Sequence, residues 1–401
     1  MMNIAVAQSG GPTCVINASL LGVFRAAQAS GAVDRVYGSV HGIEGVLHGE
    51  LVNLNERLAD PDSQQLLRQT PGAALGSCRC KLPDPASGDP VYEQIAARFR
   101  EYGIGAFFYI GGNDSMDTAA KLASYFGAHD IPVRVIGVPK TIDNDLLHTD
   151  HTPGFGSAAR YLAVTMQEII RDCCAYRLQS VTVVEVMGRS AGWLTASCCV
   201  LRDMGEEAPH LIYLPEGAFS EAQFLADVRA LLKTHRTVIA AVSEGVTPTD
   251  AAGYQSGALD AFGHKYLSGI GKHLEQAVKA QIGCKVRSIE LNVMQRCASH
   301  LASETDLAEA ETIGGAAVRA ALAGETGRMM VFRRVSDAPY RVEIGSVDAA
   351  LAANGERCFP TAWITPAQNN VRDEAIAYFR PLIQGEPVIR MRGGLPEMWR
   401  L

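Results

Sequence analysis

Residues 133–145 read VRVIGVPKTIDND and join an apolar run to a charged turn. The run Val133–Val138 is rich in β-branched residues, which predicts a buried strand. A proline ends the run, and Lys140, Asp143 and Asp145 follow within six residues. This grouping favours a phosphate ligand, because a lysine neutralises charge on a departing phosphate while a carboxylate takes a proton from an attacking hydroxyl. The alternative is a network of Asx-turns, in which both aspartates accept hydrogen bonds from backbone amides.

Other apolar runs end in the same way, with a polar turn that contains glycine. The predicted strands, each with the turn that follows it, are Asn3–Ala7 (QSGGPT), Ala106–Ile110 (GGNDS), Ser180–Val186 (MGRSAG), His210–Leu214 (PEG) and Thr237–Val242 (SEG). Helical patterns separate them over residues 15–30, 90–102, 117–126, 156–172, 192–203 and 220–234. Apolar strands that alternate with helices predict a parallel sheet covered on both faces. Ligands bind at the carboxyl ends of such strands, so the polar turns are expected to meet at one edge.

Composition and charge limit the possible classes of protein. The chain has 401 residues, of which 47% are apolar and 20% charged, and this fits a globular protein of two domains. A net charge of −7 argues against nucleic acid or an anionic membrane as a partner. No apolar run approaches the ~20 residues that span a bilayer, and the start MMNIAVAQSGG is expected to be a strand and not a leader. Ten scattered cysteines without zinc-like spacing favour the cytoplasm.

Two Gly-Gly turns offer backbone amides to a phosphate. In SGGPTCVIN, Gly10 and Gly11 lie between a strand and the start of a helix, which suits a phosphate, although a plain tight turn explains them equally well. In IGGNDSMDT, Gly112 precedes Asn113 and Asp114, whose oxygens suit Mg²⁺ or cap the next helix. Neither a P-loop nor a dinucleotide-binding fingerprint occurs.

Arginines and one glutamate accompany these turns. Arg189 lies in MGRSAG, Arg79 in LGSCR, and Arg287 and Arg296 bracket the segment SIELNVMQ. A planar guanidinium donates two parallel hydrogen bonds to a phosphate, so these arginines suit a phosphorylated ligand. The alternative is that each is a surface arginine whose aliphatic part packs on the protein. Glu244 in SEG either accepts hydrogen bonds from sugar hydroxyls or lies near a helix N-cap.

The ordered set of motifs resembles the phosphofructokinase family over roughly residues 3–335. The motifs are SGG, LGSCR, GGNDS, PKTIDND, VVEVMGR, SEG and the pair R-x8-R, and of these TIDND and VVEVMGR are the specific ones. The resemblance implies two similar Rossmann-like α/β domains, each with three layers and a mostly parallel sheet, with the active site in the cleft between them. It also implies a homodimer or homotetramer that transfers a phosphoryl group to the 1-hydroxyl of fructose 6-phosphate, with Mg²⁺, in glycolysis.

The resemblance assigns roles to individual residues. Asp143 takes the proton of the sugar 1-hydroxyl, and Thr141 and Asp145 contact substrate or order the metal shell. Asn113 replaces the family's metal-binding aspartate, so Mg²⁺ would shift towards Asp114 or rely on phosphates. The residues assigned to fructose 6-phosphate are also Met187, Gly188, Arg189, Glu244, Arg296 and Arg287, the last at a position that reaches a neighbouring subunit's site. Those that face the phosphoryl donor are Gly10, Gly11, Arg79 and Gly112.

Asp114 and Lys140 indicate which donor is used. Members that use ATP resemble GGDG and PGTIDND, with glycine at both positions. Glycine at the position of Asp114 leaves room for the α-phosphate of ATP, whereas a carboxylate at this position fills that space and repels the phosphate. At ~4 Å and an effective dielectric of about 20, the repulsion is about 4 kcal/mol before screening. Lys140 compensates charge on the phosphate that departs from pyrophosphate. The pair therefore resembles the pyrophosphate-dependent branch, whose reaction is reversible.

Other functions remain open at this point. An ATP-dependent phosphofructokinase would have to tolerate Asp114. A sugar-phosphate sensor without turnover has no need of Asp143, and a dehydrogenase would need the missing dinucleotide fingerprint. Two departures from the family, Val293 and Ser180, fall where a sugar-phosphate ligand and a cross-subunit arginine are usual.

The domain boundaries follow from the motif order. Residues 1–155 with about 297–335 are expected to form the donor domain, and residues 156–296 with about 336–401 the fructose 6-phosphate domain. A stretch rich in Gly, Ala, Thr and Asp at residues 247–268 predicts an insertion.

Overall fold

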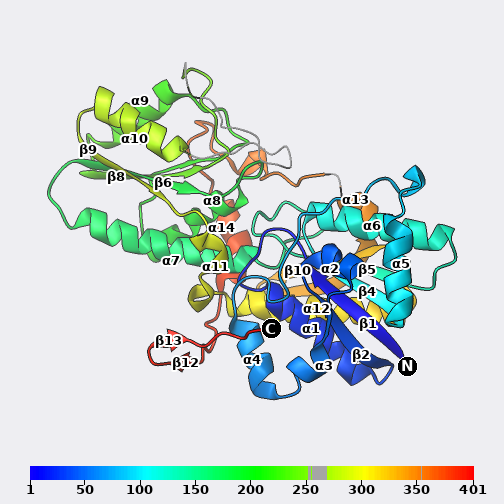
Figure 1. Cartoon of the computed structure of the whole chain (residues 1–401). Coiled ribbons are helices and arrows are strands. Elements are labelled where there is room, and N and C mark those ends of the chain that lie inside the picture. Colours follow the sequence, from blue (N-terminus) through cyan, green and yellow to red (C-terminus); the bar gives the residue numbers. More distant parts are fainter. Residues whose placement is uncertain (252–253, 255–268, 354) are drawn as a thin grey trace.

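Two α/β units lie side by side in the computed structural model of the chain (Figure 1). Most of the expected insertion at residues 247–268 lies outside the described residues. The structure describes residues 1–251, 254, 269–353 and 355–401.

The first unit is built on a seven-stranded sheet. Its strands, in spatial order, are β11 (Tyr340–Asp348), β10 (Arg328–Asp337), β5 (Arg134–Pro139), β4 (Ile104–Gly111), β1 (Met2–Gln8), β2 (Val33–Ser39) and β3 (Leu51–Asn53). The strands from β10 to β2 run parallel, and β11 and β3 pair antiparallel at the two edges. Alternation along β1 buries Val6 on one face and Ala7 on the other, so helices must cover both faces.

Helices α1, α3, α4 and α12 pack on the Val6 face, and α2, α5 and α6 on the Ala7 face. Their bounds, with those of the short η1 and α13, are α1 (Ile16–Ser30), α2 (Gly42–His48), α3 (Leu54–Arg57), α4 (Pro61–Gln69), η1 (Pro85–Ser87), α5 (Val91–Glu101), α6 (Asn113–Ala128), α12 (Glu304–Leu322) and α13 (Ala349–Ala352). Glycines let α1 and α12 approach closely. A Cβ on Gly22 would lie 2.0 Å from the carbonyl oxygen of Glu311, and one on Gly314 would lie 2.2 Å from that of Ser19.

The second unit has a four-stranded parallel sheet. Its strands, in spatial order, are β7 (Leu211–Tyr213), β8 (Thr237–Ser243), β6 (Ser180–Val186) and β9 (Lys285–Glu290). Its helices are α7 (Phe155–Cys174), α8 (Trp193–Ala196), η2 (Ser197–Met204), α9 (Glu221–Leu231), α10 (Ile270–Gln281), α11 (Met294–Cys297), η3 (Ser299–Leu301), η4 (Thr361–Trp363), α14 (Glu374–Phe379) and η5 (Arg380–Ile383). Helices α7, α8 and α14 cover one face and α9 and α10 the other. The expected class, two α/β units with mostly parallel sheets between helices, is confirmed.

The expected domain boundary near residue 335 is wrong, because the chain crosses between the units several times. Strand β11 pairs with β10 in the first sheet, and α13 packs against Met116 of α6. The tail then enters the second unit, where Phe359 and Phe379 are buried beside Trp193. It returns through the hairpin of β12 (Met391–Arg392) and β13 (Leu395–Pro396) to the first unit, where Trp399 is buried near α4.

None of the helices in the described ranges is long and apolar enough to cross a membrane.

Candidate active site

A cavity of about 410 Å³ lies between the two units, at the carboxyl ends of β1, β4, β5, β6 and β8. The turns after these strands line it, as expected from the polar residues at each strand end. Of the residues that the sequence assigned to a site, only Gly188 and Arg287 do not line the cavity. The assigned residues that do line it are Gly10, Gly11, Arg79, Gly112, Asn113, Asp114, Lys140, Thr141, Asp143, Asp145, Met187, Arg189, Glu244 and Arg296.

Lys140 joins the turn after β5 to the turn after β1. Its side chain is buried, with the residue only 2% exposed, and its Nζ donates a hydrogen bond of 2.5 Å to the carbonyl oxygen of Gly11. Gly10 has a φ of +76°, and a Cβ there would lie 3.4 Å from Nζ, so glycine supplies both the left-handed turn and the space. Burial lowers the pKa of Lys140 to about 8, and the charge of Asp143 opposes that fall. The ammonium therefore stays charged at neutral pH and can face a phosphate.

Asp143 and Asp145 flank one buried residue, Asn144. The Asp143 amide donates to Thr141 Oγ1 at 3.1 Å, which forms a tight local turn. Burial raises the pKa of Asp143, while the charges of Lys140 and other cations oppose the rise. Burial and the charge of Asp143 raise the pKa of Asp145 to about 7. A carboxylate whose pKa lies near the working pH is an effective general base, so this pair can accept a proton from a hydroxyl.

Asn113 and Asp114 begin α6, and they differ in their surroundings. Asn113 Nδ2 donates to Asp145 Oδ2 at 3.3 Å, while its Oδ1 is buried without a partner. Asp114 is largely exposed, and its Oδ1 lies 3.1 Å from Nζ of Lys81. In the described part of the chain, no group of three or more His, Cys, Asp or Glu side chains could hold a metal. The unpaired amide oxygen and the neighbouring carboxylate could instead hold a divalent cation that would take most of its other ligands from phosphates and water.

The second unit contributes the turns after β6 and β8. The Gly188 amide donates to Glu244 Oε1 at 3.4 Å, so Gly188 shapes the wall although it does not line the cavity. A Cβ on Gly245 would lie 1.9 Å from the carbonyl oxygen of Arg189, which explains why glycine is needed where the two turns touch. Burial raises the pKa of Glu244 to about 7. The arrangement places an arginine and a hydrogen-bonding carboxyl group opposite the Lys140–Asp145 turn.

The two remaining arginines of the predicted sugar-phosphate set lie in different places. Arg296 belongs to α11 and lines the cavity, and a Cβ on Gly11 would lie 3.1 Å from its Nη1. Arg287 belongs to β9, the edge strand of the second sheet, and its Nη1 lies 3.4 Å from Asp172 Oδ2. Its side chain is 42% exposed and outside the cavity. Contact with a neighbouring subunit's site stays a prediction.

Sequence reasoning missed two charged residues that line the cavity, Lys81 and Glu356. Lys81 follows the predicted Arg79 by two positions in LGSCRCK, so the run of basic residues was a usable signal. Glu356 comes from the C-terminal tail, where no local motif marks it. Both also line an adjoining cavity of about 600 Å³, together with Asn113 and Asp114.

Comparisons with known proteins agree with this geometry. Residues 3–321 match the family model for phosphofructokinase. A protein of Xanthomonas campestris pv. campestris (strain B100), named pyrophosphate–fructose 6-phosphate 1-phosphotransferase, is 41% identical over 402 residues, which cover 98% of this chain and 95% of that protein. One of the same name from Halomonas elongata is 37% identical, over 100% of this chain and 96% of its own length. The crystal structure of pyrophosphate-dependent phosphofructokinase from Marinobacter aquaeolei has a TM-score of 0.87 and 36% identity, and covers 100% of this chain and 96% of that one. The chain therefore belongs to the phosphofructokinase family.

Proposed function

We propose that this protein transfers a phosphoryl group reversibly from pyrophosphate to the 1-hydroxyl of fructose 6-phosphate, giving fructose 1,6-bisphosphate and phosphate in glycolysis or its reversal. The observation that carries the proposal is the buried Lys140–Asp145 turn, which faces a cavity lined by Arg79, Arg189 and Arg296. Cations around two carboxylates suit a reaction that binds phosphates and removes one hydroxyl proton. The names of the relatives from Xanthomonas and Halomonas support the choice of substrates.

Each group of the turn has a chemical task. Asp143 accepts the proton of the sugar hydroxyl as that oxygen attacks phosphorus, and its raised pKa suits a base that works near neutral pH. Lys140 donates to the oxygen of the leaving phosphate and offsets the charge that develops there. Arg189 and Arg296 hold the sugar phosphate, and Glu244 accepts hydrogen bonds from sugar hydroxyls.

A divalent cation, most simply Mg²⁺, completes the proposal. The unpaired Oδ1 of Asn113 and the carboxylate of Asp145 would hold it. When bound, the ion neutralises phosphate charge and orients the donor. Asp114 is a poorer ligand than the sequence suggested, because Lys81 already pairs with it.

An ATP-dependent reaction is the second candidate, because a further cavity adjoins the candidate active site. This cavity extends the donor side of the site by about 600 Å³, which is room for a larger donor. Lys81 also offsets the charge of Asp114, so the repulsion of an α-phosphate is weaker than for an isolated carboxylate. Glu356 lines both cavities, and a donor that spans them would pass this second carboxylate. The smaller donor, pyrophosphate, needs no room in the adjoining cavity.

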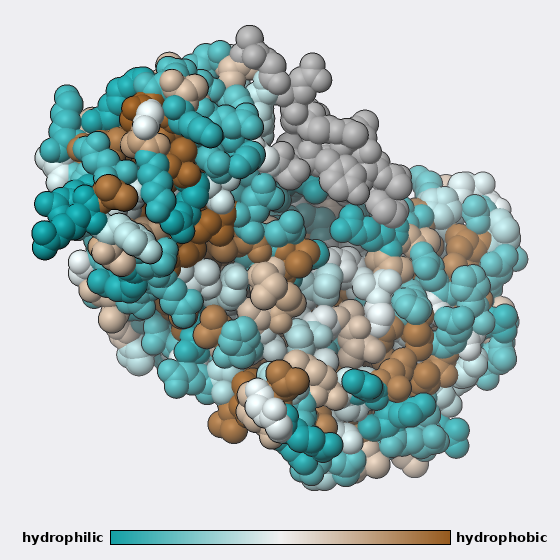
Figure 2. All heavy atoms as spheres, turned by 60° about the vertical axis from the view of Figure 1, so that its left-hand side comes forward, coloured by the Kyte–Doolittle hydropathy of each residue, from teal (hydrophilic) through white to brown (hydrophobic). Residues whose placement is uncertain are grey.

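A homodimer or homotetramer is proposed for the assembly. Figure 2 shows apolar side chains gathered on the second unit, on the side that includes β9 in Figure 1. Exposed apolar residues near this edge include Tyr176, whose ring lies 5.0 Å from Lys285 Nζ, and Val293 and Met294, which follow the strand. A self-complementary contact here would also bring Arg287 towards a second chain. We place the enzyme in the cytoplasm, because all ten cysteines are free.

A coupled assay tests the proposal. Purified protein is mixed with fructose 6-phosphate and either pyrophosphate or ATP, with and without Mg²⁺, and fructose 1,6-bisphosphate is measured. We expect turnover with pyrophosphate and Mg²⁺, and reversal when fructose 1,6-bisphosphate and phosphate are supplied. A higher kcat/KM with ATP than with pyrophosphate would show that ATP is the donor. The absence of transfer from both pyrophosphate and ATP would refute the proposed function.

A further inference from the structure

Arg357, in the C-terminal tail, contacts the turn that carries the candidate base. Its Nε and Nη2 donate to the carbonyl oxygen of Asn144 at 3.2 and 3.1 Å. Its Nη1 donates to the carbonyl oxygens of Thr149, at 2.9 Å, and Asp150. Its backbone amide donates to the carbonyl oxygen of Asp145 at 2.7 Å. Arg357 lies outside residues 3–321, which match the family model. It nevertheless binds the carbonyl groups of four residues in the segment 144–150, which contains the end of the turn.

The guanidinium of Arg357 is itself held on the other side by the second unit. Its Cζ lies 4.3 Å from the centre of the Trp193 ring, and Trp193 Nε1 donates to the Arg357 carbonyl at 2.8 Å. Nη2 also donates to the hydroxyl of Tyr378 at 3.2 Å, and that hydroxyl donates to the Asp150 carbonyl at 2.6 Å. A planar cation stacked on an indole and hydrogen-bonded through all three nitrogens has little freedom to move.

Asn144 explains why such an anchor matters. It lies between Asp143 and Asp145 and has a φ of +57°, in the left-handed region that costs a non-glycine residue roughly 1 kcal/mol or more. Two hydrogen bonds of its side chain stabilise this conformation. Oδ1 accepts from the Thr152 amide at 3.1 Å, and Nδ2 donates to the Tyr378 hydroxyl at 2.8 Å. The direction of the Asn144 backbone determines where the neighbouring carboxylates point.

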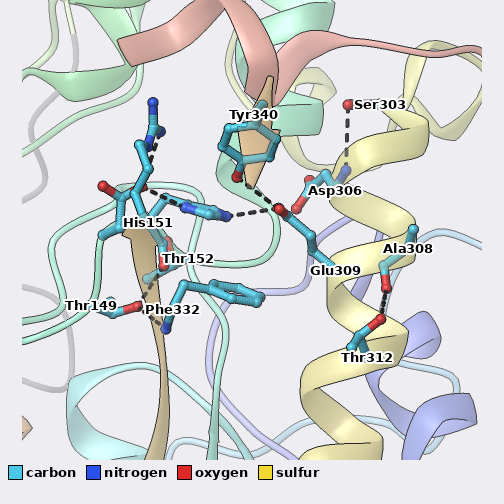
Figure 3. A network of polar contacts seen from close by, with 12 residues as sticks. Thr149, His151, Thr152, Ser303, Asp306, Ala308, Glu309, Thr312, Phe332 and Tyr340 are labelled. Carbon is cyan, nitrogen blue, oxygen red and sulfur yellow. Dashed lines mark hydrogen bonds and ion pairs between the residues drawn. The ribbon is translucent and has the colours of Figure 1, made fainter. Parts of the chain in front are cut away.

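The far end of the same segment is anchored to the first unit (Figure 3). His151 lies between Asp150 and Glu309, with nitrogen-to-oxygen distances of 2.8 Å on both sides, and Glu309 also accepts from Tyr340 at 2.7 Å. Burial opposes the charge of His151, yet the carboxylates of Glu309 and Asp150 raise its pKa to about 9. Arg334 Nε donates to the Asp150 carboxylate at 3.0 Å. The segment after the turn is thus fixed to the first unit, whereas Arg357 links the turn to the second.

We propose that Arg357 is a positioning residue for phosphoryl transfer: it binds the carbonyl groups of Asn144 and Asp145 so that the carboxylates of Asp143 and Asp145 face the cavity. The inference rests on the proposed function, since it assigns Asp143 and Asp145 to that reaction. Arg357 does not line the cavity, so it acts through the turn and not on the substrate.

Steady-state kinetics of Arg357→Met, Arg357→Lys and Arg202→Met test this role. Arg202 is the matched control, because it binds the same tail, with Nη1 2.7 Å from the Val371 carbonyl and 2.6 Å from Asp373, and does not line the cavity. We expect Arg357→Met to lower kcat by about 10²-fold with KM for both substrates within about threefold, since a misplaced turn slows chemistry more than binding. Arg357→Lys keeps the positive charge but lacks the planar guanidinium, so its kcat should lie between those of Arg357→Met and the parent. Arg202→Met should keep the parent kcat.

The split between kcat and KM separates positioning from general destabilisation. A displaced turn should lower kcat and leave KM unchanged in Arg357→Met, measured at a temperature where circular dichroism shows the variant to be folded, and kcat should stay at the parent value in Arg202→Met. If Arg357→Met does not fold, Tyr378→Phe decides, because it keeps the ring and loses the hydroxyl that binds Asn144 and Asp150. A parent-like kcat in the soluble variant would overturn the inference. A parent protein without phosphoryl transfer would instead refute the proposed function.

Discussion

Replacing Asp143 by asparagine removes the candidate base while keeping the size of the side chain. A lost general base costs about 10²–10⁴ in kcat. The burial that raises the pKa of Asp143 brings it closer to neutral pH, where a base removes a proton most effectively, so we expect a loss of about 10³-fold, or about 4 kcal/mol. The coupled assay with fructose 6-phosphate and pyrophosphate measures kcat, and KM for both substrates should change little.

The same variant should move the pH profile of the residual activity. The charge of Asp143 raises the pKa of both Asp145 and Lys140, so both limbs should shift to lower pH without it. Asp117→Asn is the control, because Asp117 pairs with Lys121 at 2.7 Å and lines only the adjoining cavity. A kcat for Asp143→Asn within about threefold of the parent would falsify the assignment of the base.

Three further predictions concern the lysine, the pH optimum and the helix packing. Lys140→Met should lower kcat with pyrophosphate by about 10²-fold without improving the use of ATP, and an unchanged kcat would show that the ammonium does not face the leaving group. In the parent, kcat should rise as Asp145 loses its proton near pH 7 and fall as Lys140 loses its own near pH 8; a flat profile from pH 6 to 9 would contradict these assignments. Gly22→Ala should lower the free energy of unfolding in urea by about 1–3 kcal/mol, because the new methyl group would meet the carbonyl of Glu311. Gly127→Ala is the control, because a Cβ at this position on α6 meets no other atom, and this change should be neutral or stabilising. If Gly22→Ala and Gly127→Ala changed the free energy of unfolding equally, the close contact between α1 and α12 would not explain the effect of Gly22→Ala.

The sequence predicts the strands around the site well, because those strands are buried on both faces. The predicted strand Ser180–Val186 has the same bounds in β6, since the four consecutive β-branched residues at positions 181–184 strongly favour a strand. Helix α6 was expected from Asp117 but begins at Asn113, because Asn, Asp and Ser after two glycines resemble a turn and here form the first turn of the helix. The expected helix over residues 192–203 is divided into α8 and the 3-10 helix η2.

The parts that escaped prediction depend on contacts between distant residues. Strand β11, at the edge of its sheet, has only exposed and half-buried residues, and it lacks the apolar run that marks the inner strands. Lys81 balances the charge of Asp114 only because two turns meet in space, and the sequence alone does not reveal that this carboxylate has a partner. Arg357 binds carbonyl groups more than two hundred residues away, and nothing in its neighbourhood in the sequence marks it.

The repeated crossing of the tail between the units has a consequence for synthesis in the cell. A nascent chain that has released β10 from the ribosome has every strand of the parallel core, yet β11, Arg357 and Trp399 are still to come. Until residue 357 emerges, the turn with Asp143 lacks its partner, and until residue 399 emerges, α4 lacks the indole that buries it. The two units therefore cannot complete their folding one after the other during translation, and full activity should appear only after residue 399 has emerged.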